Sequence, residues 1–412
     1  MSTIPGFKTR ITKKGLNYAN TVAIESLAEK LVGASIQDIE GESGHVKYEI
    51  TSLNIHEFVK PNSSITFDPS GVIIWKANGA NISGNGRWHY KVRHRLLKLS
   101  DKGKFDIRIR NICFNVQIEI GTDESGRPTI SSKACTCDID KVDITFHGGA
   151  AKFYNLFKGN MGHRLKHLFM DKMCDVIKKL VDKDGKESME KLPVTIEIDK
   201  TYLLDYRLLG NPNFTDNYIE THHKGEVFWK SDLSEAPFEV QQYLDPDDED
   251  KMAYFWTSSY LFNTYLYQAH RNEKMRYVIT SKSLPEKNKD ALKTTSMEGL
   301  FIGLLIPQIA SKYPDSELEI HVRIEDKKIV GRVGNLNIKT KVTDSNIGTV
   351  SDEAVQFLID YALRVYAEPM LNKKMQKGFP LPVSQNVTFE NHEVRISEGV
   401  MILGTDIVYT SG

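Results

Sequence analysis

The spacing of apolar residues along the first half of the chain predicts two helices with a long run of strands between them. Over residues 13–33 apolar side chains recur at every third or fourth position, which is typical of an amphipathic helix. From about 45 to 146 apolar and polar residues alternate, as in antiparallel strands with one buried face. Turn-forming residues divide this region at 61–62, 68–71, 84–86, 101–103 and 125–128. Helical spacing returns over about 152–182 and ends near Asp184-Gly185, before a strand over 192–198.

The second half repeats this order of elements. We expect a short apolar helix over 296–311, a long amphipathic helix over 352–376, and strands over 317–324, 329–334, 336–342, 386–396 and 400–409. The repeat predicts two domains of one design, residues 1–230 and 251–412, joined by a linker over 231–250. The fold class is α+β, with each domain a twisted antiparallel barrel wrapped on a long helix. An apolar interior that one helix fills incompletely can accept acyl chains.

The net charge of the 412 residues is zero, but the charge is unevenly placed. Residues 76–110 contain ten basic and two acidic side chains, so this segment attracts polyanions. Residues 231–250 contain eight acidic side chains and no basic one, and we interpret them as a solvated linker. No run of 18 apolar residues occurs, so no membrane-spanning helix is expected. The first residues lack the apolar core of a leader peptide; the protein is therefore cytosolic, or a leader has been removed.

Cysteine, acidic and histidine residues occur in this chain without the complete motifs of zinc sites, calcium loops or lipases. No zinc spacing occurs among the four cysteines, Cys113, Cys135, Cys137 and Cys174. The acidic run at 245–250 lacks the glycine and glutamate of a calcium loop, and we interpret His222-His223 as a surface pair. His147-Gly148-Gly149 resembles an oxyanion-hole motif of lipases, but no Gly-x-Ser-x-Gly nucleophile accompanies it. We therefore expect no metal, no cofactor and no enzymatic activity.

Short motifs spread along the whole chain resemble those of one known family. The opening stretch Pro5–Ala19, PGFKTRITKKGLNYA, resembles the mature start of the bactericidal/permeability-increasing protein and lipopolysaccharide-binding protein family. Further matches follow in the family's order at Asn81–Gly84, Gly126–Ile130, Phe262–Thr264, Ser345–Gly348 and Gln376–Pro382. The resemblance implies an elongated boomerang of two barrels with a central sheet between them and an apolar phospholipid pocket in each barrel. It also implies a secreted, extracellular protein of innate defence or lipid transfer, without catalytic residues.

Two features depart from the family pattern. The second half has far fewer residues between its short and long helices than the first half, so we expect a shortened C-terminal barrel. The loop at Glu40-Gly41-Glu42-Ser43 is acidic where bactericidal members are basic, which weakens the case for direct killing of bacteria.

A basic hairpin over 87–98 is the candidate site for lipopolysaccharide. Strand alternation and the resemblance together select five cations: Arg87, Lys91, Arg93, Arg95 and Lys98. The resemblance implies that such cations contact the phosphates of lipid A, which Arg binds with two hydrogen bonds and Lys as a point charge. Trp88 and Tyr90 are expected at a lipid headgroup boundary. The alternatives are a solvated outer face of a barrel strand, or a nucleic-acid site, for which no binding motif is present.

The resemblance also implies roles for apolar residues and cysteines. Apolar residues of the first two helices either line the expected lipid pocket or pack as plain core: Leu16, Ala19, Ala23, Leu27, Phe157, Leu165 and Leu168. Cys135 and Cys174 match the family's disulfide, Cys137 shares the strand face as a rival partner, and Cys113 is expected to be a buried thiol. Four sequons are candidates for glycosylation: Asn62, Asn81, Asn213 and Asn386.

The sequence is compatible with three functions. The leading hypothesis is a monomer that binds lipopolysaccharide and phospholipid at the outer-membrane surface of Gram-negative bacteria, in innate defence. The alternative is a transfer carrier of phospholipid or neutral lipid, which would not need the basic hairpin. A lipid hydrolase is disfavoured by the missing nucleophile motif, and nucleic acid is not expected as a partner.

Overall fold

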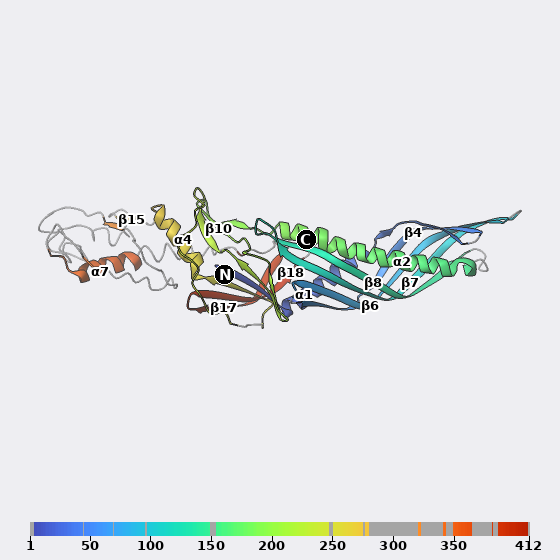
Figure 1. The fold of residues 1–412 in the computed structure, drawn as a ribbon, viewed down its shortest axis with the longest axis horizontal. Helices are drawn as coiled ribbons and strands as arrows, with labels where there is room; N and C mark the ends of the chain where they lie inside the picture. The colour runs from blue at the N-terminus through green and yellow to red at the C-terminus, as the bar shows by residue number, and fades with distance from the viewer. Residues whose placement is uncertain are drawn as a thin grey trace, which may run out of the picture.

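The computed structural model shows an elongated molecule with a long barrel of strands and helices at one end and both termini near its middle (Figure 1). The structure describes residues 4–43, 45–68, 70–94, 97–148, 154–246, 250–274, 277–279, 320–322, 341–342, 349–364, 381 and 386–410. Only the backbone is described at 35, 43, 93–94, 97–98, 154–160, 277–279, 320–322 and 362. Among the described helices, none is long and apolar enough to cross a membrane.

Strands β2 to β8 form one curled antiparallel sheet, and the antiparallel meander predicted over about 45–146 is part of it. Its strands pair in the order β2-β4-β6-β7-β8, with β3 paired to β4 and β5 to β6. The two longest strands, β6 and β7, have 23 and 26 residues. At about 3.3 Å per residue, each extends roughly 75 Å or more, which accounts for the elongated shape. The seven strands are β2 Ser35–Ile36, β3 Ile39–Ser43, β4 Val46–Val59, β5 Asn62–Asp68, β6 Val72–His94, β7 Leu97–Thr122 and β8 Pro128–His147.

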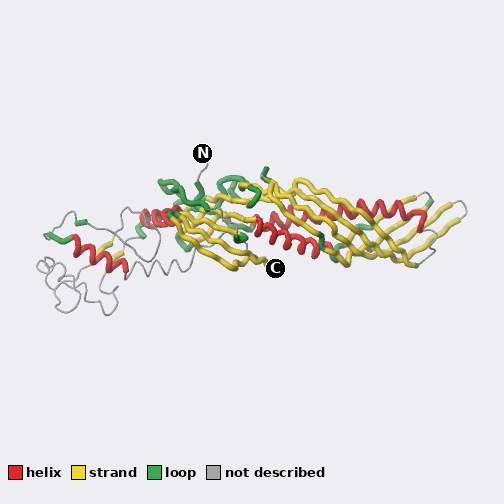
Figure 2. The backbone as a smooth tube through the Cα atoms, turned by 90° about the horizontal axis from the view of Figure 1, so that it is seen from below, coloured by secondary structure: helices red, strands yellow, loops and turns green. Residues whose placement is uncertain are grey.

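Two helices close the open side of this sheet. α1 (Lys13–Leu31) begins after Thr12, whose side chain accepts a hydrogen bond from the Gly15 backbone N–H, and it packs on β4, β5 and α2. α2 (Tyr154–Lys179) packs against β8 and β3, which lie toward opposite edges of the sheet. Figures 1 and 2 show both helices running alongside the long strands. Apolar side chains from the helices and strands form one core, which includes Leu27, Trp75, Ile107 and Leu165.

Two of the expected turns, 84–86 and 101–103, lie inside strands β6 and β7, so the sequence prediction was wrong there. The two strands meet instead at His94 and Leu97, which face each other in the register. A Cβ at Gly103 would lie 2.7 Å from the Trp88 ring and 2.3 Å from the His147 carbonyl oxygen. These glycines therefore give room to neighbouring groups rather than form turns. Residues 40–43, expected as a loop, belong to β3.

The long helix does not end near Asp184-Gly185 as predicted. After α2 the chain continues through a π-helical segment, Leu180–Gly185, and a further helix, α3 (Lys186–Glu190). Gly185 has helical backbone angles, φ −61° and ψ −47°, so it continues the helix rather than capping it. The strand expected over 192–198 is β9 (Thr195–Glu197).

A second sheet of six strands lies in the middle of the molecule and draws on distant parts of the chain. Its order is β11-β12-β1-β14-β18-β17. The first strand, β1 (Phe7–Thr12), pairs with β12 on one side and with β14 on the other, and β14 pairs with β18. This is the central sheet that the resemblance implied, although apolar spacing did not predict β1 or β14. The other strands are β11 Asn213–Phe214, β12 Tyr218–His223, β14 Ala253–Ser258, β17 Val387–Ser397 and β18 Val400–Tyr409.

Smaller elements complete the described structure, and β15 and α7 lie at the end of the molecule opposite the long barrel (Figure 1). β9, β10 (Tyr202–Asp205) and β13 (Glu226–Trp229) form a three-stranded sheet, and α4 (Ser259–Arg271), which was not predicted, packs on β13 and β14. β15 (Tyr277–Ile279) pairs with β16 (Ile320–Val322), and α7 (Asp352–Ala362) begins where the long helix of the second half was expected. The expected helix over 296–311, the strand over 329–334, most of 336–342 and the helical region beyond 364 lie outside the described residues.

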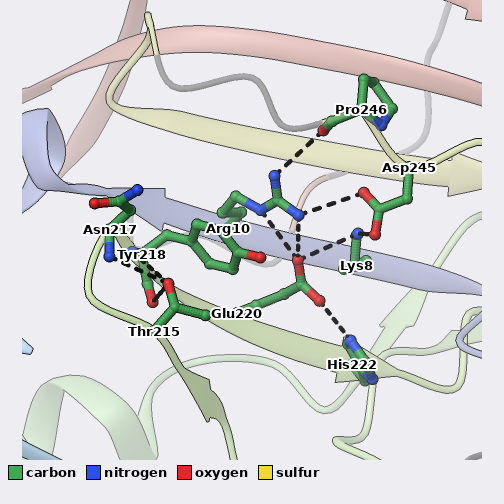
Figure 3. A network of polar contacts seen from close by, with 9 residues as sticks. All are labelled: Lys8, Arg10, Thr215, Asn217, Tyr218, Glu220, His222, Asp245 and Pro246. Atoms are coloured by element: carbon green, nitrogen blue, oxygen red, sulfur yellow. Dashed lines mark hydrogen bonds and ion pairs between the residues drawn. The ribbon is translucent and has the colours of Figure 1, made fainter. Parts of the chain in front are cut away.

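A buried charge network joins β1, β12 and the acidic segment 231–250 (Figure 3). Lys8 and Arg10 of β1 are 2% and 1% exposed. Both contact the Glu220 carboxylate of β12, Lys8 Nζ at 3.2 Å and Arg10 Nη2 at 2.8 Å. Asp245 also forms ion pairs with both cations, and the Trp256 ring centroid lies 4.1 Å from Lys8 Nζ. The acidic segment is therefore not simply solvated, because its end packs against the central sheet.

Candidate functional site

The outer face of strands β4, β6 and β7 gathers exposed cations near the end of the β6–β7 hairpin. Arg87 of β6 pairs in register with Lys104 of β7, and Lys91 of β6 pairs with Lys47 of β4. His89 lies between these two pairs and is aligned with Lys102. We call this surface the basic face; its cations with described side chains are Lys47, Arg87, Lys91, Lys102 and Lys104, all of them exposed.

Carboxylates offset the charge of the basic face only in part. Glu49 lies 3.3 Å from His89 Nδ1 and 4.0 Å from Lys91 Nζ, and Glu42 lies 3.7 Å from Lys47 Nζ. Exposed ion pairs of this kind are worth up to about 1 kcal/mol each, so a multiply charged phosphate ligand can replace them at small cost. The basic face can therefore bind polyanions, and added salt will weaken that binding.

The structure describes some of the cations selected from the sequence and adds others. Arg87 and Lys91 lie on the basic face, whereas the side chains of Arg93 and Lys98, which pair in register, and the whole of Arg95 lie outside the described residues. Sequence reasoning missed Lys102 and Lys104, because the expected turn at 101–103 hid their alignment with β6. It also missed Lys47, because the β4–β6 register that places Lys47 beside Lys91 was not considered. An antiparallel register centred on residues 95–96 would have found the two on β7.

Trp88 and Tyr90 do not reach a lipid boundary on this face, so that expectation was wrong. They alternate with the basic residues and point inward, with 2% and 3% of their surface exposed. Their rings stack at 5.6 Å between centroids, and Trp88 Nε1 donates a hydrogen bond to the Lys104 carbonyl at 2.9 Å. The two aromatic side chains thus fix β6 against β7 beneath the cations.

The residues expected to line a lipid pocket belong mainly to the barrel core. Leu16, Leu27 and Leu165 are buried, and Ala23 and Leu168 are half-buried against the same core. Ala19 is exposed, and the side chain of Phe157 lies outside the described residues. Sequence reasoning missed further core residues of α1 and α2, namely Ile24, Met161, Phe169, Met173 and Ile177. The core therefore follows both helices and offers an apolar environment along their length.

The cysteines hold α2 against the last strand of the barrel. Cys135 of β8 and Cys174 of α2 form the disulfide that the resemblance implied, with their Cα atoms 5.8 Å apart. Cys137 is a free thiol, and burial raises its pKa to about 12. Cys113 is also free, but it is half-buried rather than buried. Because the link is covalent, α2 has a fixed position on β8.

The four sequons differ in accessibility. Asn62 and Asn213 are exposed at the ends of β5 and β11, whereas Asn81 and Asn386 are half-buried. The side-chain oxygen of Asn81 accepts a hydrogen bond from the Asn111 backbone N–H at 3.1 Å. Glycan attachment is therefore sterically easiest at Asn62 and Asn213.

Titratable groups outside the basic face do not form a metal site of three or more ligands within the described part of the chain. No group of three or more His, Cys, Asp or Glu side chains suited to a metal ion occurs there. His222 bonds to Glu220, but His223 is only 9% exposed, so the two histidines do not form a surface pair as expected. Burial lowers the pKa of His223 to about 4, which keeps it neutral at pH 7. His147 Nε2 lies 2.8 Å from Asp106 Oδ2.

Both halves of the chain match models of one protein family. Residues 15–184 match the model of the LBP / BPI / CETP family, N-terminal domain, and residues 196–327 and 319–409 match the C-terminal domain of the same family. The C-terminal match is in two stretches that overlap at 319–327. This is the region where the second half was expected to be shortened.

Individual relatives cover nearly the whole chain. Lipopolysaccharide-binding protein of Homo sapiens is 26% identical, with 98% of this chain and 94% of the relative covered. Bactericidal permeability-increasing protein of Sebastes schlegelii is 24% identical, over 100% of this chain and 96% of the relative. A crystal structure of lipopolysaccharide binding protein superimposes with a TM-score of 0.70 at 25% identity, covering 99% of this chain and 100% of that one. The long barrel and the central sheet are therefore an arrangement that a solved structure shares.

Proposed function

The chain belongs to the LBP / BPI / CETP family, and from that premise we propose that it binds lipopolysaccharide and phospholipid in innate defence against Gram-negative bacteria. The basic face carries this proposal, because five exposed cations from three strands meet there at one end of the barrel. The protein is proposed to act as a secreted monomer at the bacterial outer-membrane surface, without a catalytic step, a cofactor or a nucleic-acid partner.

The two parts of an amphipathic lipid would meet different surfaces of the barrel. Lysine and arginine side chains on the basic face would bind the phosphates of lipid A, Arg87 with two hydrogen bonds and the lysines as point charges. Further contacts are proposed from Arg93, Arg95 and Lys98 at the hairpin end. Phospholipid acyl chains would lie against the apolar core along α1 and α2, which includes Leu16, Leu27 and Leu165.

Transfer of phospholipid or neutral lipid is a second candidate function. It is favoured by the length of the core, which runs along both helices and all the long strands of the barrel. A carrier of uncharged lipid would need that apolar interior but not the basic face. The two functions therefore differ in their dependence on the exposed cations.

Replacing Lys47, Arg87, Lys91 and Lys104 with alanine separates these functions. At about 0.5–1 kcal/mol for each exposed contact with phosphate, the four together should cost roughly 2–4 kcal/mol, or about 30- to 1,000-fold in affinity. We expect this loss for lipopolysaccharide in an equilibrium binding assay at low salt, and a smaller difference at high salt. Uptake of a zwitterionic phospholipid should change little.

A matched control removes the same number of cations elsewhere. Lys133, Lys141, Lys186 and Lys191 are exposed and lie outside the basic face, so their replacement with alanine should leave lipopolysaccharide affinity within a few fold. Unchanged affinity in the folded basic-face variant would contradict the proposal and would favour the lipid carrier.

A further inference from the structure

A pair of histidines on the outer surface of α2 has no role in the function proposed above. His163 and His167 are four residues apart, so they lie one above the other on the same face of the helix. Both side chains are exposed. Their Nε2 atoms lie 3.1 Å apart, and their ring centroids lie 4.5 Å apart with the ring planes at 81°. The two imidazoles are therefore in direct contact at the protein surface.

The packing of α2 determines the direction of this pair. Met161, Leu165 and Phe169 recur at every fourth position and are buried in the barrel core. In a helix with 3.6 residues per turn, the positions two before and two after Leu165 lie on the opposite side from it. Both His163 and His167 therefore point away from the core, toward solvent.

The two cations next to the pair are held by partners on the strands at the flanks of α2. Arg164 Nη1 donates a hydrogen bond to the Glu40 carbonyl oxygen of β3 at 3.0 Å. On the other flank, Lys166 Nζ lies 3.4 Å from Asp138 Oδ1 of β8. With the disulfide described above, these contacts hold α2 in place. The backbone beneath the histidines is thus a rigid support, as a pre-organised site requires.

A cation can reach the histidine pair from solvent. Gly159, one turn before His163, has no side chain that could cover the pair. At Gly162, an added Cβ would meet no atom of the described residues within 4 Å, apart from the backbone of its own helix. Asp171, one turn after His167, is exposed and carries a negative charge, which favours the approach of a cation.

The separation of the two Nε2 atoms matches that of two ligands of one metal ion. Histidine nitrogens bind zinc at about 2.0–2.1 Å. If both Nε2 atoms lie at that distance from one ion, their separation of 3.1 Å corresponds to an angle of roughly 95–102° at the ion. This angle lies between the roughly 90° of octahedral and the roughly 109° of tetrahedral coordination. Two histidines four residues apart on a helix also supply zinc ligands in the His-Glu-x-x-His motif.

We propose that His163 and His167 bind one divalent transition-metal ion of the zinc and copper class, with water in its remaining coordination positions. Imidazole suits both ions, and a given nitrogen site binds copper(II) more tightly than zinc. Arg164 stands where the His-Glu-x-x-His motif has its glutamate, so the site lacks that general base and serves binding alone. The site is separate from the basic face and does not depend on the function proposed above.

The expected affinity follows from the number of protein ligands. Structural zinc sites have four protein ligands, whereas this site has two. With roughly half the binding free energy of a four-ligand site, the pair should bind zinc with a Kd of about 1–200 µM. Binding is therefore reversible, and removal of either imidazole should abolish chelation.

The test is isothermal titration calorimetry of the full chain, without a histidine tag, with zinc chloride. His163→Ala and His167→Ala should each weaken binding by at least about tenfold, because one imidazole cannot chelate the ion. The matched control replaces His56 of β4 and His392 of β17 with alanine. These two histidines are exposed and belong to different sheets, so the control should change zinc affinity less than about threefold.

Electron paramagnetic resonance with one equivalent of copper(II) adds a readout of the ligands themselves. The spectrum of the native chain should show coupling to two imidazole nitrogens, and that of each single variant coupling to one fewer. Zinc affinity that is lost in both histidine variants and kept in the control supports the proposal. The proposal is overturned if the chain does not bind zinc, if either histidine variant keeps its affinity, if the control loses as much, or if the copper spectra are identical.

Discussion

At the scale of single residues, Glu220 is the group on which the buried charge network depends. Burial alone would raise its pKa, but the hydrogen bond with His222, the charges of Lys8 and Arg10 and the hydrogen bonds from Arg10 outweigh burial and lower the pKa to about 2. A carboxyl group whose pKa is lower in the folded than in the unfolded state stabilises the fold above the unfolded value. This contribution is lost as the pH falls from about 4.5 to about 2.

Glu220→Gln should therefore lower the free energy of unfolding at pH 7 by about 2–4 kcal/mol, because Lys8 and Arg10 would keep Asp245 as their one carboxylate partner in the network. Urea unfolding at pH 7, 4.5 and 3 would measure the loss, and the variant should show a weaker dependence on pH below 4.5. The control is Glu235→Gln, in which an exposed carboxylate paired with Lys224 is removed at a cost of at most about 1 kcal/mol. If both variants lost the same free energy of unfolding, burial of the charge network would make no additional contribution to stability.

At the scale of elements, close packing of the hairpin strands depends on glycines that have ordinary strand conformations. Gly103→Ala should lower the free energy of unfolding by about 1–3 kcal/mol, because the added methyl group would overlap the Trp88 ring and the His147 carbonyl. Gly162→Ala in α2 is the matched substitution, and it should raise the free energy of unfolding rather than lower it. Apart from the backbone of its own helix, no atom of the described residues lies within 4 Å of the added Cβ, so the better helix former should stabilise the protein by about 0.5–1 kcal/mol. Chemical unfolding of both variants measures the two effects, and a neutral Gly103→Ala would show that Trp88 can move aside.

The same glycines show why part of the fold could not be predicted from the sequence. Apolar spacing predicted α1, most of α2 and the region of the barrel strands from β4 to β8, because each of these patterns is local. Gly86 and Gly103 have the sequence signature of turns but serve packing against rings on the neighbouring strand. In β1 the alternation fails because Lys8 and Arg10 are buried by partners more than 200 residues away. The basic face likewise depends on register, which places Lys104 beside Arg87 and cannot be read from either strand alone.

At the scale of the whole molecule, the central sheet ties together the two regions that the sequence predicted as domains. β1 pairs with β12 from the first region and with β14 from the second, and β18 lies next to β14. The division at residues 231–250 stays a prediction. In the described structure, backbone hydrogen bonds join β1, from before residues 231–250, to β14, from after them.

Expression of residues 1–246 and 250–412 as two separate chains tests how far the two regions depend on each other. We expect the chains to co-purify, because separation would leave one edge of β1 unpaired and expose Phe7 and Trp256, which are fully buried in the intact protein. Size-exclusion chromatography of the co-expressed chains gives the answer. Two separately folded species would instead support independent domains.

The order of the central-sheet strands along the chain also determines when each strand is synthesised. β14 begins 241 residues after β1 ends (253 − 12), so at roughly 5–20 residues per second it leaves the ribosome about 12–50 s later. The barrel strands are consecutive and can assemble as they emerge. Lys8 and Arg10 cannot form their ion pairs until Glu220 and Asp245 have been synthesised. During that interval β1 has an unpaired edge, which is a surface prone to wrong association between nascent chains. The protein's yield on folding should therefore depend on chaperones that hold its first dozen residues until the later strands arrive.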